Sequence, residues 1–242
     1  MITIAGKDVY TEIDELVAVG RTALVLIDMQ RDFVSPDGAF AGLGIDVSMY
    51  RDAIPRMASL LDAARTHGVP VVHLQNTQLD QHLSDSPAQL RFNLRMHAAA
   101  RQGDAPLRYT VPGTPGHEFI PELAPRAGEA VVPKYRSSGF WATPLDLVLR
   151  SNGVESVVVA GCTTEGCVES TARDALFNDF HVVIAQDCVA SDDREQHDAS
   201  MLLMSHRFDL ADSGRIAAAW SHGRPARPGT GVPTPASTHD GL

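Results

Sequence analysis

Short apolar runs alternate with segments of helical periodicity along most of this chain, and this alternation is the strongest constraint on its fold. The runs are rich in Val and Ile, without polar alternation, and occupy residues 23–27, 69–74, 130–133, 156–161 and 181–185, with a weaker run at 208–211. Segments of helical period lie between them, at residues 54–67, 144–152, 165–179 and 195–206. Such runs are typical of strands buried on both faces of a parallel sheet. The pattern predicts an α/β fold, with a doubly wound, mainly parallel six-stranded sheet and helices on both faces.

The alternation sets the expected domain boundaries. We expect an N-terminal arm at residues 1–20, one domain at 21–222 and a flexible Pro/Gly-rich tail at 223–242. The stretch 75–128 is less regular, with a predicted helix at 87–101 and a Pro/Gly loop at 111–116. We expect this stretch to cover one end of the sheet.

Charge and hydropathy exclude several classes of partner. The 20 basic and 30 acidic residues give a formal net charge of −10, which disfavours a partner bound through its phosphates, such as a nucleic acid. No stretch approaches the length of a membrane-spanning apolar run, and the first residues lack the pattern of a signal peptide. We therefore expect a soluble, cytoplasmic protein that binds neither nucleic acid nor membranes.

Three chemically complementary residues follow three of the predicted strands. Asp28 and Lys134 come directly after the runs 23–27 and 130–133, and Cys167 lies a few residues after the run 156–161. Taken singly, an Asp can cap a helix, a Cys can be a small core residue and a Lys can lie at the surface. Ligands of such sheets bind beyond the carboxyl ends of the strands, where these residues would meet. A carboxylate, an ammonium and a thiol at one edge are the components of an activated thiolate site.

The other cysteines and the lysine content add to this interpretation. Cys162 and Cys188 form neither a disulfide framework nor a zinc-ligand spacing with Cys167, and we expect them in the core. Lys7 and Lys134 are the only lysines among the 20 basic residues. A lone Lys after an apolar run suggests a need for a compact ammonium that Arg cannot supply.

Three segments resemble the isochorismatase-like cysteine hydrolase family. They are TALVLIDMQRDFV, VVPKYRSSGFWATPLDLVLRSNGV and VVVAGCTTEGCVESTARDALFNDFHVVIAQD, in this order. The resemblance implies a Rossmann-type three-layer sandwich in which Asp28, Lys134 and Cys167 are catalytic. It also implies a non-proline cis peptide before Thr163, and an oxyanion hole formed by the backbone N–H groups of Thr163 and Cys167. Asp28 would take the thiol proton, and Lys134 with the helix N-terminus would lower the thiol pKa.

Within this family, the segments are most similar to the ureidoacrylate amidohydrolase and biuret hydrolase branch. That resemblance implies hydrolysis of a C–N bond in a small linear amide, ureido or carbamoyl compound through an acyl-thioester on Cys167. It also implies homo-oligomers, dimers or tetramers, and we expect a neighbouring subunit to close the pocket at residues 75–128. Ser137 stands where the ureidoacrylate enzymes have Tyr, which leaves the particular compound open. The residues expected to bind substrate are Gln75, Asn76, Arg136, Ser138, Phe140 and Trp141.

Other functions are compatible with the same fold. The protein could be an isochorismatase-type hydrolase of vinyl ethers, a nicotinamidase-like amidase or a non-catalytic binder of a small ligand. A nicotinamidase would carry a metal site with Asp-x-His spacing, but Asp80 and His82 lie too far from the strand end. We therefore expect neither a metal nor a cofactor. The chain lacks the G-x-S-x-G motif of serine hydrolases and a G-x-G-x-x-G motif after the first run.

Overall fold

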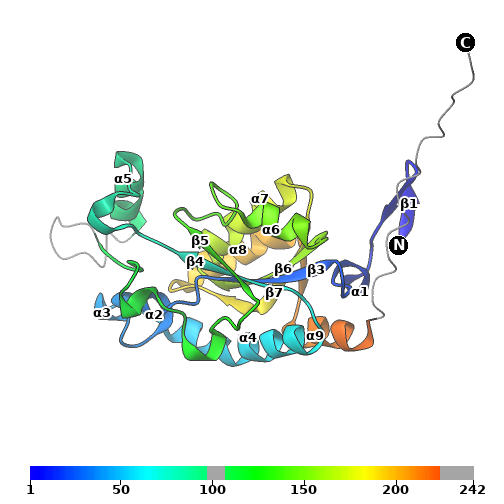
Figure 1. Ribbon diagram of the computed structural model, residues 1–242, viewed down its shortest axis with the longest axis horizontal. Coiled ribbons are helices and arrows are strands. Elements are labelled where there is room, and N and C mark those ends of the chain that lie inside the picture. The colour runs from blue at the N-terminus through cyan, green and yellow to red at the C-terminus, as the bar shows by residue number, and fades with distance from the viewer. Residues whose placement is uncertain (97–106, 224–242) are drawn as a thin grey trace, which may run out of the picture.

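The computed structural model describes residues 1–96 and 107–223, and its centre is a six-stranded parallel sheet (Figure 1). The strand order is β5-β4-β3-β6-β7-β8, and every pair in this order is parallel. The strands are β3 Thr22–Ile27, β4 Val71–Asn76, β5 Ala130–Lys134, β6 Ser156–Cys162, β7 His181–Ala190 and β8 Asp209–Ala211. The order reverses on either side of β3, which is the doubly wound topology. The predicted fold class is confirmed.

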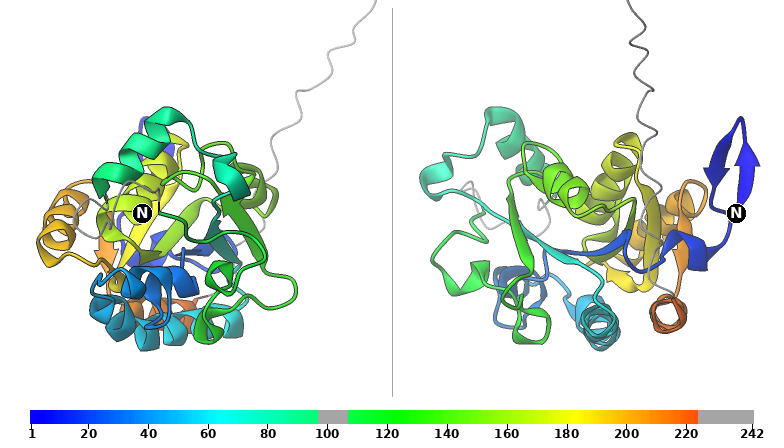
Figure 2. Two further views of the ribbon diagram at one scale, coloured as in Figure 1. Left: turned by 90° about the vertical axis from the view of Figure 1, so that its left-hand side faces the viewer. Right: turned by 45° about the vertical axis from the view of Figure 1, so that its right-hand side comes forward.

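Helices cover both faces of this sheet. α4 (Ser48–Thr66) and α9 (Ser213–His222) lie against one face, and α6 (Leu145–Ser151), α7 (Glu169–Phe177) and α8 (Arg194–Ser205) cover the other (Figures 1 and 2). Successive side chains of β3 divide between the two cores, with Leu24 and Leu26 packed on the α4 side and Val25 on the α6 side. Alternate residues of a strand point to opposite faces, so a strand between two helical layers must be apolar throughout.

The N-terminal arm and the C-terminal end of the domain contain secondary structure that was not predicted. The arm forms an antiparallel hairpin of β1 (Ile2–Ile4) and β2 (Lys7–Val9), followed by α1 (Ile13–Leu16). α9 was not predicted, although it lies inside the predicted domain. It is fixed by Trp220, which is buried and whose Nε1 donates to the Val17 carbonyl at 2.9 Å. The predicted flexible tail lies, apart from Gly223, outside the described residues.

Irregular elements lie at the carboxyl edge of the sheet. Two short helices, α2 (Arg31–Val34) and α3 (Ala39–Gly42), follow β3. Of the helix predicted at 87–101, α5 covers Pro87–Met96, and the remainder lies outside the described residues. The segment predicted as one helix at 165–179 begins as a π-helical turn, η4 (Thr164–Val168), before α7. The 3₁₀ turns are η1 Asp80–His82, η2 Pro115–His117 and η3 Pro121–Leu123.

None of the helices in residues 1–96 and 107–223 has the length and apolarity that crossing a membrane requires.

Candidate active site

Asp28, Lys134 and Cys167 meet at the carboxyl edge of the sheet. Asp28 follows β3, Lys134 is the last residue of β5, and Cys167 lies in η4 after β6. Lys134 Nζ lies 2.7 Å from Asp28 Oδ2 and donates to Cys167 Sγ at 3.1 Å. The thiol in turn hydrogen-bonds to the Asp28 carboxylate. Asp28 thus contacts two residues that are each more than 100 positions away in the chain.

The carboxylate and the ammonium are fully enclosed. Their side chains are 1% and 0% exposed, respectively. The backbone N–H of Asn76 donates to Asp28 Oδ1 at 2.9 Å, and Lys134 Nζ also donates to the Arg136 carbonyl at 3.1 Å. A buried ion pair is tolerated only when its remaining hydrogen-bonding capacity is used. Asp28 has a φ of 56°, a left-handed conformation that Asp adopts more readily than most residues.

Burial dominates the protonation of this group. It raises the pKa of Asp28, and the neighbouring Lys134 only partly offsets this. Burial alone would lower the pKa of Lys134, but Asp28 and Cys167 together hold that pKa above its usual value. Burial raises the pKa of the Cys167 thiol to about 12, although Lys134 acts in the opposite direction. Lys134 thus lowers the thiol pKa as expected, but burial has the larger effect, so the net shift of the Cys167 pKa is upward.

The backbone before Cys167 has the feature that the family resemblance implied. The peptide bond between Cys162 and Thr163 is cis, which confirms that prediction. The carbonyl of Thr163 accepts from the N–H groups of Gly166 at 3.2 Å and Val168 at 3.1 Å. A side chain at position 166 would collide with Thr163, because an added Cβ would lie 2.5 Å from its Oγ1. This close turn places Thr163 and Cys167 on the same pocket wall.

A pocket of about 120 Å³ opens over Cys167, and we call it the Cys167 pocket. Its lining combines aromatic rings, amides and three charged side chains. Cys167 is partly exposed in it, whereas Asp28 and Lys134 lie behind the wall. Besides Cys167, the lining residues are Phe33, Phe40, Asn76, Gln89, Phe92, Asn93, Met96, Tyr109, Tyr135, Arg136, Ser137, Thr163, Glu165, Gly166, Asp192 and Gln196.

Two of the six predicted substrate-binding residues line this pocket, namely Asn76 and Arg136. The side-chain amide of Asn76 donates to Thr110 Oγ1 at 2.8 Å, which fixes its orientation. Gln75 precedes Asn76 on β4 and is not part of the lining. Its Nε2 instead donates to the backbone carbonyl of His117 at 3.0 Å, so it holds η2 in place. Adjacent strand residues point to opposite faces, which explains why only one of this pair reaches the pocket.

The structure places Ser138, Phe140 and Trp141 outside the Cys167 pocket. Ser138 hydrogen-bonds to Asp174, and the Phe140 ring packs 5.9 Å from that of Phe180 in the core. Trp141 is 55% exposed and lines a separate shallow depression with Ser138. The chain beyond Ser137 turns toward α7, so the expectation that these residues form the pocket walls is not met.

The pocket residues that sequence reasoning missed are aromatic and acidic. Phe33, Phe40 and Tyr109 form a triangle with ring centroids 4.9, 5.5 and 5.7 Å apart. Phe33 stands in the segment DMQRDFV, close enough to Asp28 to have been considered, whereas Phe40 and Tyr109 carry no such signal. Glu165 lies two residues before Cys167, and Asp192 follows the carboxyl end of β7. The rule that selected Asp28 would not have selected Asp192, because the apolar run was predicted to end at residue 185, whereas β7 continues to Ala190.

The two residues weighed as metal ligands both have protein partners. Asp80 pairs with Arg108, and His82 Nδ1 lies 2.8 Å from Asp85 Oδ2. In the part of the chain that the structure describes, no three or more His, Cys, Asp and Glu side chains come together as metal ligands would. Independence from metal remains a prediction to be tested by chelation.

Comparison with known proteins assigns the family. The Isochorismatase domain family matches residues 22–211, and this chain belongs to it. A cysteine hydrolase from Pseudomonas syringae pv. phaseolicola 1448A is 26% identical, with a TM-score of 0.71 over 83% of this chain and 92% of that one. An isochorismatase-like hydrolase from Alkaliphilus metalliredigens is 29% identical, with a TM-score of 0.66 over 83% and 99%. N-carbamoylsarcosine amidase from Thermoplasma acidophilum is 26% identical, with a TM-score of 0.61 over 80% and 96%.

Proposed function

We propose that this protein is a cysteine-dependent amidohydrolase that cleaves a C–N bond of a small linear amide, ureido or carbamoyl compound. The observation that carries the proposal is the position of the Cys167 thiol. It lies in the wall of a small pocket, and its sulfur is 3.1 Å from the ammonium of a buried Lys134–Asp28 pair. A nucleophile, a base and a fixed positive charge therefore act on one substrate carbonyl.

The first half of the reaction begins with the protonated thiol. Burial raises the pKa of Asp28, so its ionised carboxylate is a stronger base than an exposed one and takes the proton as the sulfur attacks. Lys134 stabilises the negative charge that develops on the sulfur. Because burial raises the pKa of the thiol, the mechanism has Asp28 remove the thiol proton as the sulfur attacks the carbonyl.

The backbone completes the mechanism. The N–H groups of Thr163 and Cys167 hold the tetrahedral oxyanion, a contribution of roughly 3 kcal/mol per donor in other acyl-transfer enzymes. Asp28 then returns its proton to the departing nitrogen, and the C–N bond breaks to leave an acyl-thioester on Cys167. Water adds to the thioester carbonyl, the sulfur leaves, and the free thiol is restored.

The pocket supports a small substrate with several hydrogen-bonding groups. Its volume of about 120 Å³ and its amides Asn76, Gln89 and Asn93 suit a planar amide or ureido group. The similarity to N-carbamoylsarcosine amidase supports a carbamoyl or ureido compound. We place the protein near the ureidoacrylate amidohydrolase and biuret hydrolase branch, where the motif around Lys134 is most similar.

A substrate panel tests this proposal. Ammonia release is measured with ureido acids, biuret, carbamoyl amino acids, linear amides and nicotinamide, and loss of isochorismate is followed in parallel. We expect turnover of a linear ureido, carbamoyl or amide compound, and little of nicotinamide or isochorismate. Faster turnover of isochorismate than of every C–N compound would contradict the proposed reaction. A panel with no turnover at all would favour a non-catalytic binder.

We also propose that the active form is a homo-oligomer, a dimer or tetramer, in which a neighbouring subunit closes the Cys167 pocket at residues 75–128. Phe92 and Met96 of α5 line the pocket and remain 45% and 47% exposed in the single chain, which supports this arrangement. Size-exclusion chromatography with light scattering, at the assay concentration, tests it. An active monomer would contradict it.

A further inference from the structure

The Cys167 pocket has more negative than positive charge in its wall. Glu165 and Asp192 line it, against one cationic lining residue among those described, Arg136. Behind the wall, Asp28 and Lys134 neutralise one another. The pocket therefore offers a ligand two carboxylates and one guanidinium.

Neither carboxylate is used in an ion pair within residues 1–96 and 107–223. Asp192 accepts a hydrogen bond from the Tyr50 hydroxyl at 2.8 Å, and Glu165 accepts from the side chains of Ser191 and Thr163. Burial raises the pKa of Glu165, and the charge of Asp192 raises it further. Carboxylates supported only by neutral donors gain free energy when a cation approaches them, and this gain is larger for the half-buried Glu165 than for the exposed Asp192.

The single guanidinium is held at the rim. Arg136 Nη1 donates to the Tyr135 carbonyl, and the Arg136 guanidinium lies 5.2 Å from the ring centroid of Trp141. The side chains of Arg136 and Trp141 both line the shallow depression outside the pocket. Arg136 therefore has contacts other than Glu165 and Asp192, and no ion pair joins it to either carboxylate among the described residues. Asp192 also lines a second cavity, which contains Arg56 and Arg194.

The same pocket is rich in aromatic rings. Besides the triangle of Phe33, Phe40 and Tyr109, it is lined by Phe92 and Tyr135. The face of an aromatic ring attracts a cation within about 6 Å, and the attraction is stronger where water is excluded. Aromatic rings together with carboxylates form the usual environment for an ammonium group, whereas an anionic group would be repelled by the same carboxylates.

We propose that Glu165 and Asp192, with the aromatic wall, determine substrate specificity by binding a cationic end of the substrate, an ammonium or guanidinium, while its amide or ureido carbonyl lies at Cys167. This inference rests on the proposed function for its reacting group. It narrows the substrate class from small linear C–N compounds to those with a positively charged end. Neither residue is assigned a proton-transfer role.

Charged thiol reagents test this inference without requiring turnover. Methanethiosulfonates with an aminoethyl or a sulfonatoethyl group react with Cys167 in the same way, each forming a mixed disulfide and releasing methanesulfinate, and the two transferred groups differ in charge. Their rate ratio at Cys167, divided by their ratio on free cysteine, measures the charge preference of the pocket. We expect the cationic reagent to be favoured about tenfold or more, which corresponds to about 1.4 kcal/mol or more. The neutral methyl reagent should fall between the two.

Matched variants assign the preference to the acidic wall. Glu165→Gln and Asp192→Asn should each reduce the rate ratio at least about threefold, because each removes one carboxylate and keeps the side-chain shape. Asp52→Asn removes the same charge on α4 outside this pocket and should leave the ratio unchanged. Circular dichroism and a melting curve establish that each variant is folded, and the two acidic-wall variants provide independent tests.

The outcomes separate this inference from the proposed function. A ratio no higher than that of free cysteine, or one that neither acidic-wall variant lowers, would overturn the cationic specificity. In the kinetic arm, N-(3-aminopropyl)urea should have a kcat/KM at least about tenfold above that of butylurea, and 3-ureidopropionic acid should be the poorest. If the neutral or anionic compound is preferred, the inference is again wrong. If no compound in any panel is hydrolysed, the proposed function fails, while the reagent ratio still decides the charge preference.

Discussion

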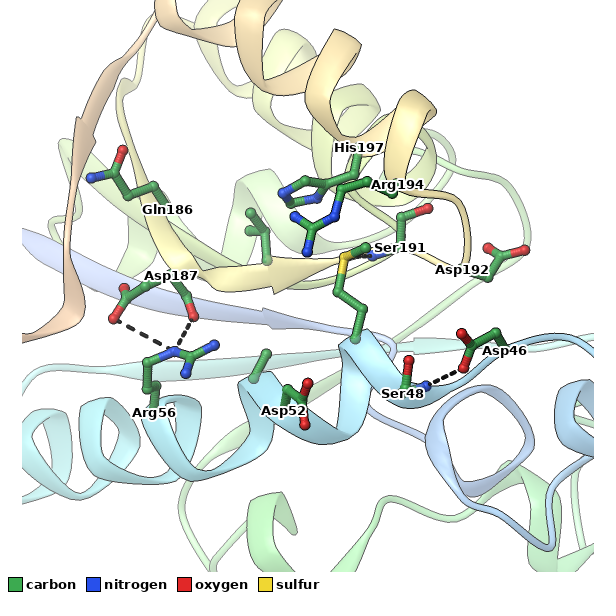
Figure 3. A pocket seen from close by; sticks show the side chains of 13 residues that line it. Asp46, Ser48, Asp52, Arg56, Gln186, Asp187, Ser191, Asp192, Arg194 and His197 are labelled. Carbon is green, nitrogen blue, oxygen red and sulfur yellow. Dashed lines mark hydrogen bonds and ion pairs between the residues drawn. The ribbon is translucent and has the colours of Figure 1, made fainter.

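Two polar sites lie at the carboxyl edge of the same sheet, and they differ in what surrounds their charges. At the Cys167 pocket, Lys134 and Asp28 are 2.7 Å apart and at most 1% exposed. The second site is a cavity of about 680 Å³ between α4 and the segment from β7 to α8, which we call the outer cavity (Figure 3). There, Arg56 Nε lies 3.9 Å from Asp187 Oδ2, and the two side chains are 50% and 24% exposed, respectively.

Several polar groups of the outer cavity make structural hydrogen bonds. The backbone N–H of Ser48 is capped by Asp46, as Figure 3 shows, and Asp187 accepts from the backbone and hydroxyl of Ser213 at 2.7 Å. His197 Nδ1 lies 2.8 Å from Thr164 Oγ1. Asp192 lines both sites. The side chains of Asp52, Arg56 and Arg194 are exposed, so water screens their charges and they contribute little to one another. Of the two sites, the smaller pocket has the arrangement for chemistry, because it combines a thiol with an ion pair that solvent cannot screen.

The largest expected effect is the loss of activity when the thiol is replaced. Cys167→Ser should fold but lose about a thousandfold or more in kcat, because a hydroxyl is far harder to deprotonate than a thiol at the same base. Cys188→Ala, which alters a buried cysteine outside the pocket, should keep activity close to that of the unmodified protein. Steady-state kinetics on the best panel substrate provide the measurement. Near-normal turnover of Cys167→Ser would contradict the assignment of catalysis to the Cys167 pocket rather than to the outer cavity.

The second expected effect contrasts the two cations. Lys134→Arg should lower kcat/KM about a hundredfold or more, because a planar guanidinium does not fit a cavity shaped around a compact ammonium with 0% exposure. Arg56→Lys makes the reverse change in the outer cavity and should have almost no effect. Retained activity in Lys134→Arg would reduce Lys134 to a structural role.

The third effect is on stability and needs no substrate. Lys134→Met leaves Asp28 buried without its partner and should lower the free energy of unfolding by about 3–5 kcal/mol. Arg56→Met breaks an exposed pair and should cost less than about 1 kcal/mol. Urea unfolding followed by circular dichroism compares the two variants. Equal losses would show that burial does not distinguish the sites as we describe.

The smallest expected effect is that of metal removal. Activity should survive exhaustive treatment with EDTA, because Asp80 and His82 are paired with Arg108 and Asp85 instead of converging on a metal. Metal content is measured in the same samples. A stoichiometric metal that is lost together with activity would favour the nicotinamidase-like alternative.

The strands and the central residues could be predicted because their signals are local. A strand buried on both faces is apolar throughout, so β3 and β6 are visible in the sequence, and a polar residue directly after such a strand stands out, as Asp28 does. α9 was missed although Ile216 and Trp220 have helical spacing, because their burial depends on packing against α4 and α1.

The pocket walls and the protonation of the site are not local properties. Ser138, Phe140 and Trp141 were predicted to line the pocket because they follow Lys134 closely in the sequence. The chain turns away from the pocket after Ser137, so Trp141 lies outside the pocket. Phe40 and Tyr109 come from segments far apart and meet only in the fold. The pKa of Cys167 depends on how completely the fold excludes water, which no sequence motif reports.

The most direct test of the central claim is the stoichiometry of inactivation by iodoacetamide. Cys162 and Cys188 are buried, whereas Cys167 is partly exposed in its pocket. Peptide mass spectrometry and residual activity are measured on the same time points. The account predicts that activity falls in direct proportion to alkylation of Cys167, with the other two cysteines unmodified. Full alkylation of Cys167 with activity retained would contradict it.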